Sequence, residues 1–266
     1  MRGRWIMKLR VKGSSWERDR FRSIIKAPPS PVRMRIEQAV QREIDALIDD
    51  AVKDILHSTR TYTGDDLLDD VDRICRALTD KFRGKYEREV VKYYLREKSR
   101  IAQQLKTKLD FRAHDLEALR ELTRSEIMWR AYRGLGNVLS EKVNGRIKSF
   151  FEHGDYERLV KEIRADAGIG YSRSERIART ETGVISNLAK ANAFDEYDPE
   201  GMKRYMWYGP DDVRNTDWCR LIRKLTRQGV SLGQLRDIIR VHGDTRLKNR
   251  RDYQVHINCR HTFVPI

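Results

Sequence analysis

Residues 67–93 have the sequence LLDDVDRICRALTDKFRGKYEREVVKY, and this stretch decides the fold class. Apolar side chains recur in it at spacings of three and four, while the opposite face is almost entirely charged. This is the period of an amphipathic α-helix, so we expect a long helix with one buried face, broken near Gly84. The apolar stripe consists of Leu67, Val71, Ile74, Leu78, Phe82, Tyr86, Val90 and Tyr93.

The preceding segment predicts another helix of the same kind. Residues 33–57 carry an apolar stripe with the same spacing, and residues 62–65 interrupt the pattern between the two segments. A short turn between two amphipathic helices favours an antiparallel pair, although the spacing also suits self-association as a coiled coil. The stripe consists of Ile36, Val40, Ile44, Leu47, Ala51 and Ile55.

Helical periodicity continues beyond this pair, in shorter stripes that predict further helices. These stripes lie at residues 101–109, 115–128, 138–150 and 156–167. We expect a bend at Gly134 and Gly136 and a turn at residues 168–170, because glycine in the interior of a helix destabilises it. A last long helix is predicted from Glu175 onward, with a serine just before it as the N-cap.

Near residue 200 the pattern changes to that of a small mixed module. Residues 203–208 alternate and are rich in aromatic side chains, which predicts a strand. Two short helices are predicted at residues 216–226 and 231–241, and one or two strands at residues 253–266. The fold is therefore predicted to be mainly α with a small C-terminal α+β module: long antiparallel helices followed by a compact mixed domain.

Charge divides the chain in a similar way. The 266 residues include 55 Lys+Arg and 40 Asp+Glu, for a net charge of +15. Residues 1–36 contain eleven bases and two acids, residues 201–266 contain fourteen and six, and the middle is nearly neutral. We expect three parts: a basic, proline-ended flexible arm at 1–32, a helical body at 33–170 and the α+β module at 171–266.

Composition excludes some classes of protein and favours others. No run of about 18 apolar residues occurs, so we expect no transmembrane segment and no membrane anchor. Three cysteines give no disulfide framework and favour a reducing compartment. Basic ends suit nucleic acid, an anionic membrane face or an acidic protein partner. The bases that we assign to binding nucleic acid or a partner are Arg2, Arg4, Lys8, Arg10, Lys12, Lys248, Arg250 and Arg251.

Three separated fragments carry the most specific pattern. They are RIARTET at residues 176–182, DVRNTDWC at 212–219 and HINCRH at 256–261. Their order and spacing resemble the phage minor head proteins of the phage Mu protein F-like head morphogenesis family, over residues 110–266. The matching residues are Arg179, Thr180, Glu181, Trp207, Asp212, Arg214, Cys219, His256, Asn258, Cys259 and Arg260.

The resemblance implies a virion protein of a tailed phage or prophage, acting in head morphogenesis at or near the portal and close to packaged DNA. It implies two kinds of partner: the portal or major capsid protein, and phage DNA. The DNA would be bound through its phosphate backbone, without recognition of the base sequence. Its location would be the virion head, and the host cytoplasm during assembly. Two other functions stay open: a DNA-binding or metal-dependent DNA-processing protein, and an effector carried by a phage-type head module.

The last two fragments also contain a candidate structural zinc site. Cys219, His256, Cys259 and His261 could supply four tetrahedral ligands. Many members of the family have a further cysteine where this chain has Thr216, and a cysteine in place of His261. If the last segment is a strand, Cys259 and His261 share a face and His256 does not. The alternative is therefore that the cysteines are plain buried residues.

The charged motif residues allow a catalytic and a structural interpretation. Arg179-Thr180-Glu181 and Asp212-x-Arg214 could bring an acid and a base together. We favour a bracing role, in which bidentate arginine–carboxylate pairs fasten a helix to a turn. The sequence lacks the phosphate-binding loop, the dinucleotide fingerprint, the nucleophile elbow and His-Glu-x-x-His, so we expect no catalytic residues and no enzyme.

Overall fold

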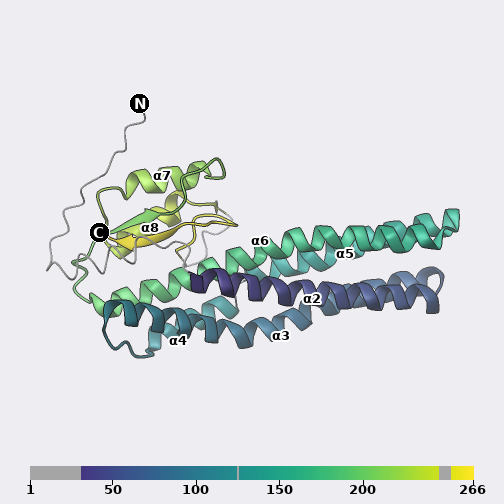
Figure 1. Cartoon of the computed structure of the whole chain (residues 1–266), viewed down its shortest axis with the longest axis horizontal. Helices are drawn as coiled ribbons and strands as arrows, with labels where there is room; N and C mark the ends of the chain where they lie inside the picture. The colour runs from purple at the N-terminus through teal and green to yellow at the C-terminus, as the bar shows by residue number, and fades with distance from the viewer. Residues whose placement is uncertain (1–30, 125, 246–252) are drawn as a thin grey trace.

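The computed structural model describes residues 31–124, 126–245 and 253–266, and its fold is mainly α with a small two-stranded antiparallel sheet near the C-terminus (Figure 1). The elongated body consists of α2 (Pro31–Thr61), α3 (Gly64–Leu105), α4 (Ala113–Thr123), α5 (Glu126–His153) and α6 (Tyr156–Tyr197). The C-terminal module consists of β1 (Tyr205–Tyr208), α7 (Asp217–Leu225), α8 (Leu232–His242) and β2 (Thr262–Pro265).

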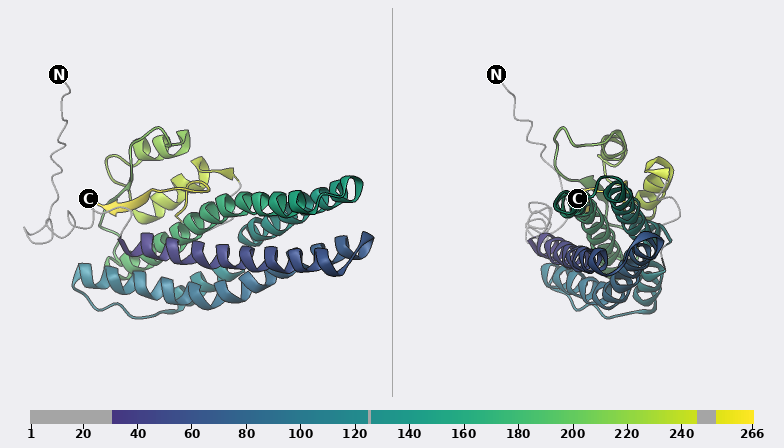
Figure 2. Two further views of the ribbon diagram at one scale, coloured as in Figure 1. Left: turned by 45° about the vertical axis from the view of Figure 1, so that its right-hand side comes forward. Right: turned by 90° about the vertical axis from the view of Figure 1, so that its right-hand side faces the viewer.

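Four helices of the body form a bundle of two antiparallel hairpins. The α2–α3 and α5–α6 hairpins lie side by side and both turn at the end of the bundle far from the module (Figures 1 and 2). Every residue of the two predicted apolar stripes, on α2 and on α3, is buried in the shared core. The antiparallel helical pair predicted from the sequence is confirmed. Among the described helices, none has the length and apolar character needed to cross a membrane.

The predicted glycine breaks are wrong. Helix α3 continues through Gly84, α5 through Gly134 and Gly136, and α6 through residues 168–170. At Gly136 the missing side chain permits close packing, since a Cβ there would lie 2.6 Å from the Cys75 carbonyl oxygen. Tertiary packing therefore outweighs the low helix propensity of glycine.

Two of the predicted boundaries, at residues 32 and 170, fall inside helices of the structure. Pro31 is the first residue of α2, so the helix begins before the predicted end of the arm at residue 32; residues 1–30 lie outside the described residues. The boundary at residue 170 falls inside α6, which starts at Tyr156 with Asp155 as its N-cap. One core extends along α6 as far as Ala189, and the core of the module begins with Ala191 on the same helix.

The module is built on the predicted aromatic strand. β1 pairs antiparallel with β2, with Trp207 opposite Phe263, and both side chains are fully buried. Thr216 caps α7 and Ser231 caps α8 through their hydroxyl oxygens, close to the helix starts expected from the sequence. Only residues 262–265 of the last segment form a strand; residues 253–261 are irregular.

A polar stripe on α6 holds this last segment. Asn187 donates a hydrogen bond to the Tyr253 carbonyl oxygen at 2.8 Å and accepts one from the Thr262 hydroxyl at 2.6 Å. One turn further on, the Lys190 ammonium donates to the same hydroxyl at 2.6 Å. Burial lowers the pKa of Lys190 to about 7. These buried bonds attach the C-terminal strand directly to the helical body.

Two glycines of α5 test the close helix contact. Gly136→Ala should lower the free energy of unfolding by about 1–3 kcal/mol, because the added Cβ overpacks the contact with α3. Gly145→Ala in the same helix has nothing within 4 Å of an added Cβ. That control should gain about 0.5–1 kcal/mol from helix propensity alone. Urea unfolding measures both; equal stability of the two variants would contradict the close approach of α3 and α5 at Gly136.

Candidate metal centre

The first and third sequence fragments meet at Asn258. The Thr180 hydroxyl oxygen accepts a hydrogen bond from the Asn258 backbone N–H at 2.8 Å. Arg179 donates to the Asn258 side-chain oxygen at 3.1 Å, and also pairs with Glu37 and Glu175. Asn258 has φ of 64°, a left-handed conformation that asparagine tolerates better than most residues. The loop therefore reverses direction where α6 holds it.

The second and third fragments meet through an ion pair. The Arg260 guanidinium donates two hydrogen bonds to the Asp212 carboxylate, at 2.8 and 2.6 Å. The Arg214 backbone N–H donates to the same carboxylate at 3.0 Å. The Arg260 bond, and then the Arg214 N–H, hold the pKa of Asp212 well below its usual range. The geometry fits the bracing interpretation, but Asp212 pairs with Arg260 and not with the arginine of the first fragment.

Two matched residues lie away from this loop. Glu181 is buried and accepts a hydrogen bond from the Tyr86 hydroxyl at 3.2 Å, so it joins α6 to α3. Trp207 is fully buried in the module, and its ring stacks on that of His261 with centroids 6.4 Å apart. Both residues stabilise the helices and the strand on which the loop packs.

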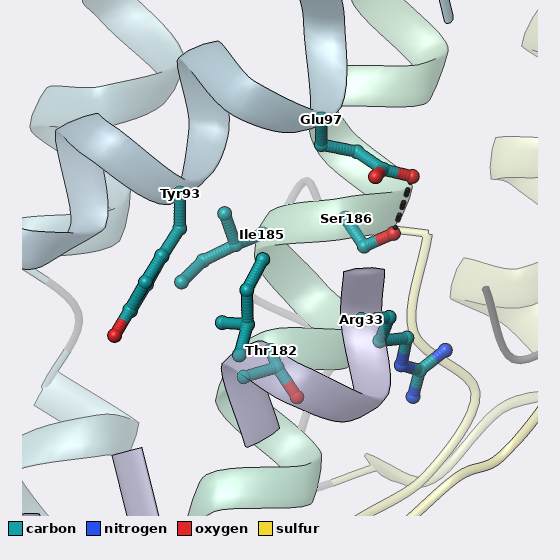
Figure 3. Close-up of a pocket in the computed structure, with 7 residues that line it drawn as sticks. Arg33, Tyr93, Glu97, Thr182, Ile185 and Ser186 are labelled. Atoms are coloured by element: carbon teal, nitrogen blue, oxygen red, sulfur yellow. Dashed lines mark hydrogen bonds between the residues drawn. The ribbon is translucent and has the colours of Figure 1, made fainter. Parts of the chain in front are cut away.

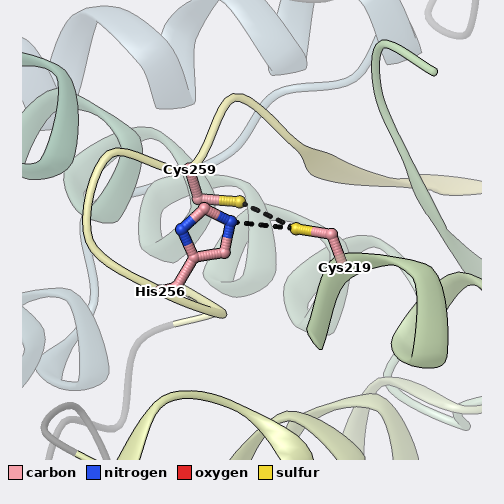
Figure 4. A group of neighbouring side chains, drawn as sticks. All are labelled: Cys219, His256 and Cys259. Carbon is pink, nitrogen blue, oxygen red and sulfur yellow. Dashed lines mark hydrogen bonds between the residues drawn. The ribbon is translucent and has the colours of Figure 1, made fainter. Parts of the chain in front are cut away.

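Three of the predicted metal ligands converge (Figure 4). The Cys219 sulfur, near the start of α7, lies 3.1 Å from His256 Nε2 and 3.5 Å from the Cys259 sulfur. The three ligand atoms all lie within 4.8 Å of one another. His261 lies beside them, with Nδ1 at 3.8 Å from the Cys259 sulfur. All four residues are buried.

The distance between the two sulfurs, 3.5 Å, suits a tetrahedral zinc site, whereas the Cys219–His256 distance of 3.1 Å would have to lengthen on binding. Zn–S bonds of about 2.3 Å and Zn–N bonds of about 2.0 Å place ligand atoms roughly 3.5–3.8 Å apart. The sequence-based objection, that His256 would face away from Cys259, assumed a strand. The reversal at Asn258 removes it and brings His256 to the same side as Cys259. His261 contacts Cys259 but does not belong to the group of three whose ligand atoms all lie within 4.8 Å of one another.

Hydrogen bonds and burial affect the protonation of the candidate ligands. The Ile257 carbonyl oxygen lies 2.6 Å from His256 Nδ1, so that nitrogen holds a proton, and Nε2 is the ring nitrogen that faces Cys219. Hydrogen bonding from Cys259, and then from His256, lowers the pKa of Cys219 although burial opposes it. Burial raises the pKa of Cys259. A thiolate is the form of cysteine that binds zinc.

Contacts with α2 and with Gly209 hold the loop that carries Cys259 and His261 in place. Arg33, in the first turn of α2, donates a hydrogen bond to the Cys259 carbonyl oxygen at 3.0 Å. A Cβ on Gly209 would collide with the His261 ring, so glycine at this position permits the approach of His261 to the cluster. Because the four side chains are buried, a metal here would stabilise the module and would not meet a substrate.

Two other places in the described residues are weaker candidates for a functional site. His114, Asp115 and Glu196 lie together, but the Lys98 ammonium already binds both carboxylates, at 2.6 and 2.9 Å. A small cavity lies between α2, α3 and α6, where Glu97 accepts a hydrogen bond from Ser186 (Figure 3). Its volume is about 10 Å³, which is room for about one water molecule.

The remaining predicted binding residues cannot be placed. The five bases of the arm and Lys248, Arg250 and Arg251 all lie outside the described residues. Sequence reasoning missed Arg33, whose guanidinium is buried against the loop. It follows a proline-rich basic segment and looks like one more base of the arm. It also missed the polar stripe on α6, which lies in an otherwise apolar face.

Comparison with known proteins gives no match: no protein-family model, curated protein or solved structure matches this chain. The resemblance to the head morphogenesis family therefore depends on the three fragments alone.

Removal of a ligand tests the zinc site. The purified protein should contain about one zinc ion per chain, and a chelator should lower its melting temperature. Cys259→Ser should lose the zinc and melt at the temperature of the chelated protein. Cys75→Ala is the matched control, because Cys75 is equally buried but lies in the helical body. Elemental analysis measures the content; zinc absent from wild type, or retained by Cys259→Ser, would contradict the site.

Proposed function

We propose that this chain is a minor head protein of a tailed phage or prophage, acting in head morphogenesis at or near the portal. One observation carries the proposal: the fragments on which the resemblance depends contact one another. Arg179 and Asn258 are 79 positions apart, and Asp212 and Arg260 are 48 apart, yet both pairs are hydrogen-bonded. A chance resemblance gives no reason for these residues to meet.

The role that we propose is structural and not enzymatic. The motif residues fasten the C-terminal loop, and the buried cysteine and histidine cluster would hold a structural zinc ion. The long bundle offers extended helical surface for the portal or major capsid protein. The protein would then reside in the virion head, after assembly in the host cytoplasm.

The basic ends support a position close to packaged DNA. Residues 1–36 contain eleven bases and two acids. Such an arm binds the phosphate backbone electrostatically, without reading the base sequence. A partner with an acidic groove would attract the same arm.

Particle composition tests the proposed location. Heads should be purified on a density gradient from a host that carries the gene, and probed with an antibody against the chain. We expect the protein to sediment with the heads, and deletion of the gene to abolish infectious particles until the intact gene is restored. Normal particles from the deletion strain would contradict a role in assembly. Magnesium-dependent cleavage of DNA by the purified protein would favour the DNA-processing alternative.

Truncation tests the arm. Deletion of residues 1–30 leaves all of α2, including the buried Arg33, and should leave the melting temperature unchanged. Binding to a random-sequence DNA duplex should weaken at least tenfold at low salt. The log–log salt dependence should become shallower by about 0.9 for each phosphate that the truncated protein no longer neutralises. Fluorescence anisotropy measures both quantities. Equal affinity of the intact and truncated proteins at low salt would show that the arm does not bind DNA.

A further inference from the structure

Helix α7 has two faces that differ in burial. Its inner face carries Cys219 and Ile222, which are fully buried in the module. Its outer face carries Trp218, Leu221 and Leu225, which are 38%, 39% and 42% exposed. Spacings of three and four residues place these three side chains on one side of the helix. The helix therefore presents an apolar stripe to solvent.

Basic side chains surround this stripe. Arg220 and Lys224 are exposed on the same helix, and Arg214 and Val213 are exposed in the turn before it, Val213 by 96%. Residues 211–227 contain five Lys or Arg and three Asp, a net charge of +2, and three of the arginines each pair with one of these Asp. An apolar centre with a charged rim is typical of a protein interface. We call this surface, formed by the exposed residues between 213 and 225, the α7 face.

The opposite end of the molecule has the complementary character. The distal end comprises residues 61–73 and 151–157, which include the helix ends where α2 meets α3 and α5 meets α6 (Figure 1). The two segments adjoin, because Arg60 donates a hydrogen bond to the Tyr156 hydroxyl at 3.1 Å. Together with the flanking Arg60 and Arg158, these two segments contain eight Asp or Glu and three Arg, a net charge of −5. Tyr62 and Phe151 are exposed among them, by 44% and 46%.

Some of these carboxylates already have partners within the chain: Asp70 accepts a hydrogen bond from Ser58, Asp72 accepts one from Asn144, and Asp155 caps α6. Asp65 and Asp66 lie in the first turn of α3, where they favour the helix dipole. Asp69 lies beyond that turn and is exposed, as is Glu152 at the end of α5. The distal end thus combines exposed aromatic rings with carboxylates, as the α7 face combines apolar side chains with bases.

We propose that two copies of this chain associate head to tail, with the α7 face of one copy on the distal end of the next. The apolar side chains supply the buried centre, and the opposite charges set the orientation. Because the two surfaces differ, each copy keeps one of them available for a further copy, and the contact generates a chain or a ring. This inference does not depend on the phage assignment.

A second copy fits better than the other occupants. The arm at residues 1–30 is itself basic, so the α7 face repels it, although the arm could compete for the distal end. A different acidic protein would match the α7 face but would leave the acidic, aromatic distal end without a role. A copy of the chain accounts for both surfaces at once.

Charge reversal on each surface tests the contact. The α7 variant is Arg220→Glu with Lys224→Glu, and the end variant is Asp66→Lys with Asp69→Lys. Lys161→Glu with Arg164→Glu is the matched control, because both residues are exposed on α6 outside the two surfaces. Melting temperature and zinc content show that each variant is folded. Sedimentation velocity over a range of concentrations, at low and high salt, measures the mass.

Wild type and control should gain mass with concentration, and less so at high salt, because screening weakens the contact. Each reversed variant alone should stay monomeric. An equimolar mixture of the two should regain the salt-sensitive gain in mass, because the two unchanged surfaces attract each other and so do the two reversed ones. A monomeric wild type, or a mixture that stays monomeric, would overturn the proposal. A different outcome would show that the arm, and not the α7 face, binds the distal end. In that case deletion of residues 1–30 would abolish association, and the α7 variant would still associate as wild type does.

Discussion

The module depends on one constraint: residues 253–261 are largely buried but belong to no β-ladder. A buried backbone group without a partner costs about 1–3 kcal/mol, so each must be satisfied by other means. Side chains of the helical body do this: Asn187 bonds the Tyr253 carbonyl, Thr180 the Asn258 N–H and Arg33 the Cys259 carbonyl. The helices therefore determine where His256 and Cys259 lie.

This arrangement makes the body and the module one unit. Helix α6 contributes to the core of the bundle and then to the core of the module, without interruption. A shift of the last segment along α6 would separate Lys190 and Asn187 from their partners in β2 and beside it. Leaving an amide and an ammonium buried without partners costs far more than exposing a little apolar surface, so the register of the segment is fixed.

The periodicity of the sequence was sufficient to predict the long helices, because their apolar stripes are local and regular. It was insufficient at Gly136 and Gly170, where packing against another helix, and not helix propensity, decides whether the helix continues. The four candidate zinc ligands were recognisable by type and spacing. Their convergence was not, because it requires the left-handed turn at Asn258 and a bond from Arg33, 226 positions away from its partner. Such distant pairs leave no trace in a single sequence.

The separation of those partners has a consequence for biosynthesis. A chain that leaves the ribosome from its N-terminus completes α2 to α6 before the segment that covers the polar stripe has been made. Until then Thr180, Asn187 and Lys190 face water, on a helix whose neighbouring apolar surface is also uncovered. The bundle can assemble early through local hairpins, whereas the module can close only when residues 253–266 have been made. The nascent protein thus passes through a stage in which the face of α6 that binds these residues is still exposed to water.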